Sequence, residues 1–237
     1  DFKFTGKAKV NGTDAGTYTM GLAANQFENA NGNFANVEFS VTDGKLMINP
    51  RTVVLTSEGG SKPYDGTALK KPDVTVTGDG FVAGEVTDVK ATGSVTNTSE
   101  GEVTNTIVYT AGDNFKESNY SITKNEGKLS ITASTEKVVV TITGNKENEL
   151  YDGTEKTAKG YTVNTNNELY TEADFKFSGK AEVNGKDAGT YNMGLVAAQF
   201  KNKNQNFNKV TFVVTDGELV INPRTVVLTS EGGSKPY

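Results

Sequence analysis

The feature that most constrains this chain is an internal repeat, because residues 1–64 return almost unchanged as residues 174–237. The offset is 173 residues (174 − 1), and the stretch Ile48–Tyr64 is identical to Ile221–Tyr237. A long fixed period is the sequence signature of a tandem array of structural units. Such arrays are generally selected for length, spacing or multivalency, and we therefore expect no catalytic centre.

A shorter period lies inside the long one. Tyr64-Asp65-Gly66-Thr67 recurs 87 residues later (151 − 64) as Tyr151-Asp152-Gly153-Thr154. The long period thus holds two related modules, each within the usual size range of a domain. The predicted organisation is the C-terminal part of a preceding module (1–50), a first complete module (51–133), a second complete module (135–223) and the first strand of a following module (224–237). We expect the chain to be a segment of a longer polypeptide.

Composition excludes several classes of function. The chain has no Cys, His or Trp, which removes disulfides, thiolate chemistry, the usual general base and the commonest metal ligands. A net charge of −5, with both signs interspersed, argues against a nucleic-acid surface. No apolar run is long enough for insertion into a membrane. We predict no enzyme activity, no cofactor and no metal site.

The local pattern predicts β-structure throughout. Val37–Val41 alternates apolar and polar residues, as a strand with one buried face does. Asp43-Gly44 follows it and predicts a hairpin, since Asp-Gly suits the turn that joins two antiparallel strands. Asn11-Gly12, Asn184-Gly185 and Asp216-Gly217 are interpreted in the same way. Helical periodicity is weak, and at most a short turn is expected within residues 23–33.

The two copies also predict which side chains are buried. Between them, positions 36, 38 and 40 change, whereas Val37, Phe39 and Val41 do not. Change at every second residue indicates a strand with one solvent-exposed face. The predicted core of residues 1–50 is Phe2, Phe4, Val10, Tyr18, Met20, Leu22, Val37, Phe39, Val41, Leu46 and Ile48. Phe27 and Phe34, with Phe200 and Phe207 in the second copy, are expected to close the ends of the cores.

The predicted fold class is all-β, with small modules of an immunoglobulin-like sandwich or a β-grasp-like type; the sequence leaves these two alternatives open. The junction Asn49-Pro50 is short and stiff, with no Gly/Ser tether. One strand leading directly into the next places the ends of a module at opposite poles. We therefore expect an end-to-end, extended rod.

Short motifs in both modules resemble those of a known family. Tyr64-Asp65-Gly66 and Asn119-Tyr120-Ser121-Ile122 mark the first module, and Ala188-Gly189-Thr190-Tyr191 marks the second. These residues resemble the YDG and MBG (mucin-binding, glycine-rich) repeats of large bacterial cell-surface proteins and adhesins. The first module lacks the Ala-Gly-Thr-Tyr element, and the second has Phe207 in place of the Tyr. The resemblance implies an extracellular or cell-surface stalk repeat.

Two sets of residues are candidates for site chemistry. Tyr64, Asp65, Gly66, Tyr151, Asp152 and Gly153 are interpreted as a structural turn motif, in which Asp caps the turn, Gly supplies positive φ and Tyr packs at a module junction. Lys137 and Asn222 are the obvious pair for an intramolecular isopeptide bond. Strand parity argues against that bond, because both residues are out of phase with the inward-facing positions.

The function predicted from the sequence is a structural stalk or spacer of a long extracellular bacterial surface protein, wall-anchored through other regions, that projects an adhesive or other functional end. Its partners would be the neighbouring modules of the same chain. Two alternatives stay open. In one, the repeats bind host mucin or glycan multivalently, with Tyr109, Tyr161 and Tyr170 as available aromatic residues. In the other, exposed edge strands pair between chains and build a filament.

Overall fold

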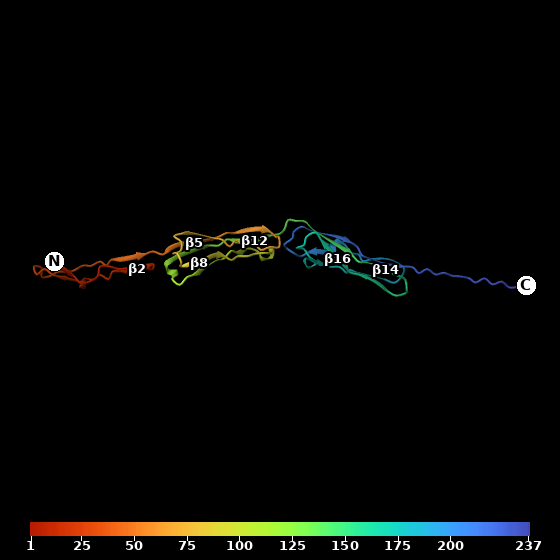
Figure 1. Cartoon of the computed structure of the whole chain (residues 1–237), viewed down its shortest axis with the longest axis horizontal. Coiled ribbons are helices and arrows are strands. Elements are labelled where there is room, and N and C mark those ends of the chain that lie inside the picture. Colours follow the sequence, from red (N-terminus) through yellow and green to blue (C-terminus); the bar gives the residue numbers. More distant parts are fainter. The chain divides into compact units, whose positions relative to one another are not determined.

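The computed structural model describes residues 1–237 and is built of short β-strands with no α-helix (Figure 1). Five 3₁₀ helices of three residues each interrupt the strands: η1 (Ala24–Gln26), η2 (Thr98–Glu100), η3 (Glu117–Asn119), η4 (Glu172–Asp174) and η5 (Ala197–Gln199). The predicted all-β class is therefore confirmed. The short turn expected within residues 23–33 is confirmed as η1.

Contacts between residues divide the chain into two compact units. Unit 1 comprises Asp1–Ser61, Leu69–Val95 and Glu102–Ser130, and unit 2 comprises Lys62–Ala68, Thr96–Gly101 and Ile131–Tyr237. The Tyr64-Asp65-Gly66 turn thus belongs to unit 2, although most of its predicted module belongs to unit 1. The division into modules 51–133 and 135–223 stays a prediction.

The strands of residues 1–132 form five small sheets. They are β1 (Phe2–Phe4), β2 (Gly16–Thr19), β3 (Phe27–Asn29), β4 (Lys45–Ile48), β5 (Arg51–Ser57), β6 (Gly60–Pro63), β7 (Val74–Gly78), β8 (Val86–Ala91), β9 (Val103–Thr104), β10 (Ile107–Ala111), β11 (Tyr120–Asn125) and β12 (Lys128–Thr132). The sheet orders are β1-β3, β2-β4, β11-β5-β7, β6-β12-β9 and β10-β8.

Strand β5 is the central strand of unit 1. It pairs with β11 in parallel and with β7 antiparallel. Val53 and Leu55 on β5 are fully buried and pack with Ile107 and Tyr120. Alternation of buried and exposed residues along β5 follows the period of two that a strand imposes.

The strands of residues 138–222 form four sheets. They are β13 (Val138–Gly144), β14 (Lys146–Leu150), β15 (Lys156–Lys159), β16 (Tyr161–Thr165), β17 (Phe175–Phe177), β18 (Glu182–Gly185), β19 (Gly189–Asn192), β20 (Phe200–Asn202), β21 (Val210–Thr215) and β22 (Glu218–Asn222). The sheet orders are β16-β13-β21, β14-β22-β19, β15-β18 and β17-β20.

Two hydrophobic clusters fill this part of unit 2. The first joins Val138, Val140 and Ile142 of β13 to Tyr170, Phe175, Phe200 and Phe207. The second joins Ala158, Met193, Leu195, Leu219 and Ile221. Tyr161, Phe177 and Val214 pack against both clusters, so the two cores are continuous.

The predicted burial of core side chains is confirmed in the second copy and is partly wrong in the first. Phe200 and Phe207 are buried as predicted, at 3% and 2% exposure. In the first copy Phe2, Phe34 and Val37 are 61%, 57% and 44% exposed, so their predicted burial is wrong. The reason is that β13 and β16 cover the second copy, whereas no such strands pack on residues 1–50.

The predicted Asp-Gly and Asn-Gly hairpins are also wrong. Asp216-Gly217 connects β21 to β22, which lie in different sheets, because each strand takes its own parallel partner. The Asp216 carboxylate instead accepts hydrogen bonds from Leu195 N (2.8 Å) and Gly194 N (3.0 Å). Residues 37–43 form no strand, and Asn184-Gly185 lies within β18. Asn11-Gly12 lies outside any strand.

Candidate functional site

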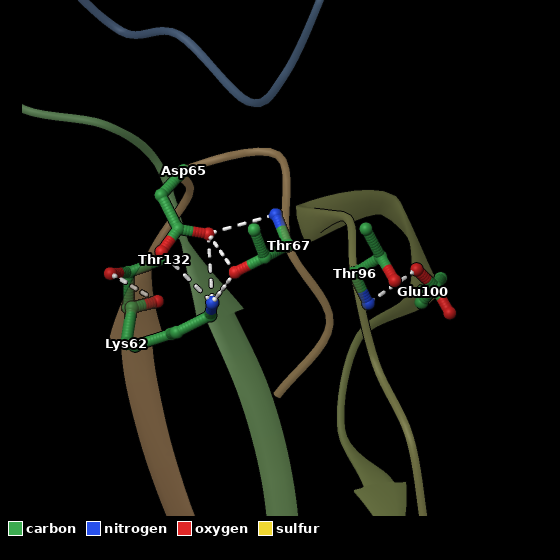
Figure 2. A network of polar contacts seen from close by, with 6 residues as sticks. All are labelled: Lys62, Asp65, Thr67, Thr96, Glu100 and Thr132. Atoms are coloured by element: carbon green, nitrogen blue, oxygen red, sulfur yellow. Dashed lines mark hydrogen bonds and ion pairs between the residues drawn. The ribbon is translucent and has the colours of Figure 1, made fainter. Parts of the chain in front are cut away.

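The Tyr-Asp-Gly-Thr segments form two turns of the same construction. Figure 2 shows the first of them. In the first, Asp65 Oδ1 accepts hydrogen bonds from Thr67 N (2.9 Å) and Thr67 Oγ1 (2.7 Å). In the second, Asp152 Oδ1 accepts from Thr154 N (2.9 Å) and Thr154 Oγ1 (2.6 Å). The glycines have φ of +79° and +82°, a conformation that favours glycine over any residue with a Cβ.

A lysine neutralises the Asp carboxylate of each turn. The lysine precedes the motif in the first turn and follows it in the second. Lys62 Nζ lies 2.7 Å from Asp65 Oδ1 and precedes the Asp by three residues. Lys156 Nζ lies 2.8 Å from Asp152 Oδ2 and follows the Asp by four residues. At the position that corresponds to Lys62, the second module has Glu149 (149 − 62 = 87). The ion pair is therefore retained although its lysine has moved, which favours a role in the turn itself.

Hydrogen bonds hold both aspartates in the ionised form. The bond from Lys62, followed by those from Thr67, holds the pKa of Asp65 well below its ordinary value of 3.8. The bond from Lys156, followed by those from Thr154, lowers the pKa of Asp152 in the same way. A carboxylate with a lowered pKa is a poor proton acceptor near neutral pH, so neither aspartate is suited to act as a general base.

We predict that the Lys62→Gln variant raises the pKa of Asp65 and leaves that of Asp152 unchanged. The lowered pKa means that each carboxylate contributes stability that is fully present above the ordinary Asp value and is lost as the pH falls through the folded value. The measurement is an NMR titration of the side-chain carboxyl carbons of both residues, each acting as the control for the other. A shift of both titrations, or of neither, would contradict the local pairing.

Tyr64 packs the first turn against other residues of unit 2. Its ring contacts that of Phe207 edge to face at a centroid distance of 5.3 Å, and its N–H donates to the Thr132 carbonyl at 2.8 Å. Gly66 lies so close to Leu169 that a Cβ would approach Leu169 Cδ2 to 2.9 Å. Both contacts lie within unit 2, so the turn is part of the packed structure of that unit.

An open cavity of about 480 Å³ lies beside this turn. Its lining combines an aromatic ring with polar groups: Tyr64, Asp65, Ser134, Glu136, Asn167 and Phe207. At the second turn, Tyr151 is 36% exposed and lines a cavity of about 470 Å³ with Asp187, Ala188 and Pro223. No group of three or more Asp or Glu side chains is placed to hold a metal ion.

Lys137 and Asn222, the pair considered for an isopeptide bond, lie at the ends of different strands. Both side chains are exposed: Lys137 precedes β13, and Asn222 ends β22 in another sheet. Asn222 Nδ2 instead donates to the Glu149 carbonyl at 3.2 Å and to the Asn148 side chain.

The three tyrosines considered for glycan binding have different environments. Tyr170 is 1% exposed in the first cluster of unit 2, and its burial raises the pKa of the phenol to about 12. Tyr161 packs edge to face on Phe177 and Phe200. Tyr109 packs near Phe81, with Lys124 Nζ 5.2 Å from its ring centroid. All three serve the aromatic packing of the fold.

Three asparagines to which the sequence analysis gave no structural role bond through their side chains to segments distant in sequence. Asn105 is fully buried, and Asn206 is 8% exposed. Asn119 is partly buried and bonds to residues more than one hundred positions away. The chain is rich in asparagine, so composition alone could not separate these residues from the others. The family motif that includes Asn119, together with the period of 87 residues that relates Asn119 to Asn206, could have drawn attention to two of them.

Comparison with known proteins identifies one of the repeats. Residues 137–223 match the family model of the MBG domain, which confirms the resemblance for this part of the chain. MBG domains are non-catalytic repeats that are typical of bacterial surface proteins. No curated protein and no solved structure gives a significant match. The helices of the chain are too short to cross a membrane.

Proposed function

We propose that this chain is a load-bearing stalk segment of an extracellular bacterial surface protein, in which the modules project an adhesive or other functional end from the cell. The mechanism is mechanical: each module resists extension when its two ends are pulled apart. Its partners are then the neighbouring modules of the same polypeptide. Membership of residues 137–223 in a family of surface-protein repeats supports the location.

The observation that carries this proposal is the parallel pairing of the first and last segments of a module. Val138 pairs with Val210 in β13–β21, and Lys146 pairs with Glu218 in β14–β22. The offset is 72 residues in both ladders (210 − 138 and 218 − 146), so the two segments run side by side in one register through two sheets. Pulling outward on the two chain ends then loads the hydrogen bonds together in shear.

The same arrangement occurs in residues 51–132. Arg51 pairs in parallel with Tyr120, an offset of 69 residues (120 − 51). Tyr64 N donates to the carbonyl of Thr132, and Thr132 Oγ1 donates to that of Lys62 at 3.3 Å. Two modules with different sequences thus share the same pairing of their end segments, as a common mechanical function requires.

Single-molecule force measurements test the proposal, and the absence of native Cys makes the attachment points easy to choose. The pair Glu136→Cys with Thr225→Cys attaches handles at opposite ends of the two parallel segments, which is the shear geometry. The matched control pair Glu136→Cys with Asn208→Cys attaches both handles at the same end and unzips the ladder. All three positions are exposed.

We expect the opposite-end pull to require a severalfold higher rupture force than the same-end pull, because hydrogen bonds loaded together must break together. Extension of one unfolded module releases roughly 300 Å of chain, at about 3.5 Å per residue. Equal rupture forces in the two geometries would contradict a load-bearing role.

A second candidate function is weak, multivalent binding of host mucin or glycan. It is favoured by the cavity at Tyr64, where an aromatic ring lies beside Asp65 and Asn167, the groups that stack on a sugar and bond its hydroxyls. The test is titration of the full chain with mucins and a glycan panel, with light scattering on the same sample. Saturable binding that Asp65→Asn weakens would favour this candidate, and concentration-dependent growth would favour a filament. A chain that stays monomeric and binds no glycan would favour the stalk function.

A further inference from the structure

Two asparagines occupy equivalent positions in the repeats. Asn119 and Asn206 are 87 residues apart (206 − 119), the same spacing that separates the two Tyr-Asp-Gly turns. Each lies directly before a buried aromatic residue, Tyr120 at 7% exposure and Phe207 at 2%. Packing of that ring fixes the backbone from which the amide group extends.

In unit 1, the Asn119 side chain contacts the loop before β2 through both of its polar atoms. Asn119 Oδ1 accepts a hydrogen bond from Ala15 N at 2.7 Å, and Nδ2 donates to Asp14 Oδ1 at 3.0 Å. Lys116 adds an ion pair to Asp14 Oδ2 at 2.7 Å. The loop and the asparagine are more than one hundred residues apart in sequence, so this contact depends on tertiary structure.

In unit 2, Asn206 makes the same contact with a different loop, the one that forms η2. Asn206 Oδ1 accepts from Thr98 N at 2.8 Å and from Thr98 Oγ1 at 2.9 Å. Its Nδ2 donates to Asn97 Oδ1 at 2.9 Å. The backbone is held as well, because Ser134 N donates to the Asn206 carbonyl at 2.8 Å.

The two contacts share their geometry although their partners differ. In both, the amide oxygen accepts from a backbone N–H and the amide nitrogen donates to the side chain of the residue before it. Those two residues are Asp14-Ala15 in one case and Asn97-Thr98 in the other. Recent duplication cannot explain the similarity, since the loop sequences are unrelated. A shared geometry on different sequences indicates that the contact itself serves a purpose.

We propose that Asn119 and Asn206 are latch residues, each of which binds its own module to a loop of the module before it and so fixes the junction between consecutive repeats. This role rests on the proposed stalk function, for which a junction that does not bend under load is useful. The two bonds of one amide set the separation of the loop and the strand and also their relative rotation.

The chain contains an internal reference for an unlatched loop. Asp187-Ala188-Gly189-Thr190-Tyr191 repeats the sequence of Asp14–Tyr18, but no asparagine contacts Asp187 and Ala188, which instead line an open cavity. The amide of Ala188 should therefore exchange its hydrogen faster than that of Ala15, although the local sequence is the same.

Amide hydrogen exchange of the full chain, followed residue by residue by NMR, tests the latch. We expect Asn119→Ala to accelerate exchange at Ala15 about tenfold, toward the Ala188 rate, because one hydrogen bond is lost. Asn206→Ala should have that effect at Thr98 and leave Ala15 unchanged. The matched controls are Ser118→Ala and Asn208→Ala, which change exposed neighbours of the two latch residues.

Three results would overturn the proposal. The first is equal amide exchange at Ala15 and Ala188 in the unmodified chain, and the second is an effect of the control variants equal to that of the latch variants. The third is faster exchange throughout a unit, including the core amides of Leu55 or Val140. The last would assign the asparagines to general stability. If the latch proposal is wrong, the opposite-end pull should still require the higher rupture force. If the stalk proposal is wrong, the two rupture forces should be equal and the exchange pattern should be unchanged.

Discussion

Leu55→Ala should destabilise the chain by roughly 2–5 kcal/mol, the usual cost of removing a buried Leu side chain and leaving a cavity. Leu55 is fully buried on the central strand of its sheet, between β7 and β11. It packs in a cluster with Ile107 and Tyr120, whose rings and branches cannot collapse into the space without moving. The measurement is urea unfolding of the full chain, followed by the fluorescence of the tyrosines.

The repeat supplies an exact control for this variant. Leu228 has the same neighbours in sequence as Leu55, since Ile221–Tyr237 is identical to Ile48–Tyr64, but it is 91% exposed. We expect Leu228→Ala to change the free energy of unfolding by less than about 0.5 kcal/mol. Similar effects for the two variants would show that local sequence, and not burial, determines the contribution of this leucine.

Asn105→Ala is expected to have the second large effect, a destabilisation of roughly 2–4 kcal/mol, because it leaves three partly buried backbone groups without partners. Asn105 Nδ2 donates to the carbonyls of Lys71 (2.8 Å) and Glu58 (3.0 Å), and Oδ1 accepts from Gly93 N (3.0 Å). The side chain is fully buried, so water cannot replace these bonds without opening the structure. One amide thus connects three segments of unit 1.

The control for this prediction is Asn125→Ala, which removes an exposed amide at the end of β11. Its effect should stay within about 0.5 kcal/mol. Asn105→Asp provides a second check, because a carboxylate facing two carbonyl oxygens is repelled and should be more destabilising at neutral pH than in acid. Denaturant unfolding at two pH values measures both effects. A stable Asn105→Ala chain would contradict the inferred connection of three segments.

The sequence predicted the β-class and the repeat, because these depend on alternation and on self-similarity along the chain. The inward face that it assigned to a strand at residues 37–41 is wrong in part, because no strand forms there and Val37 is exposed. It did not predict which strands pair. The Asp216-Gly217 hairpin is wrong because this pair connects two different sheets, and the Asp43-Gly44 hairpin is wrong because no strand precedes it. In both pairs the Asp carboxylate caps another loop. The turn chemistry at Asp65 and Asp152 was readable locally, whereas the partners of Asn105 and Asn206 are distant in sequence.

The identical stretches Ile48–Tyr64 and Ile221–Tyr237 separate what the sequence determined from what tertiary structure decided. In the first, residues 51–57 form β5, with Val53 fully buried; in the second, residues 223–237 form no strand, and Val226 is 77% exposed. Sequence alone determined the alternation that makes these residues able to form a strand. Residues 51–57 form a strand because they pair with β7 and β11. A strand satisfies its backbone hydrogen bonds and buries its side chains through neighbouring strands.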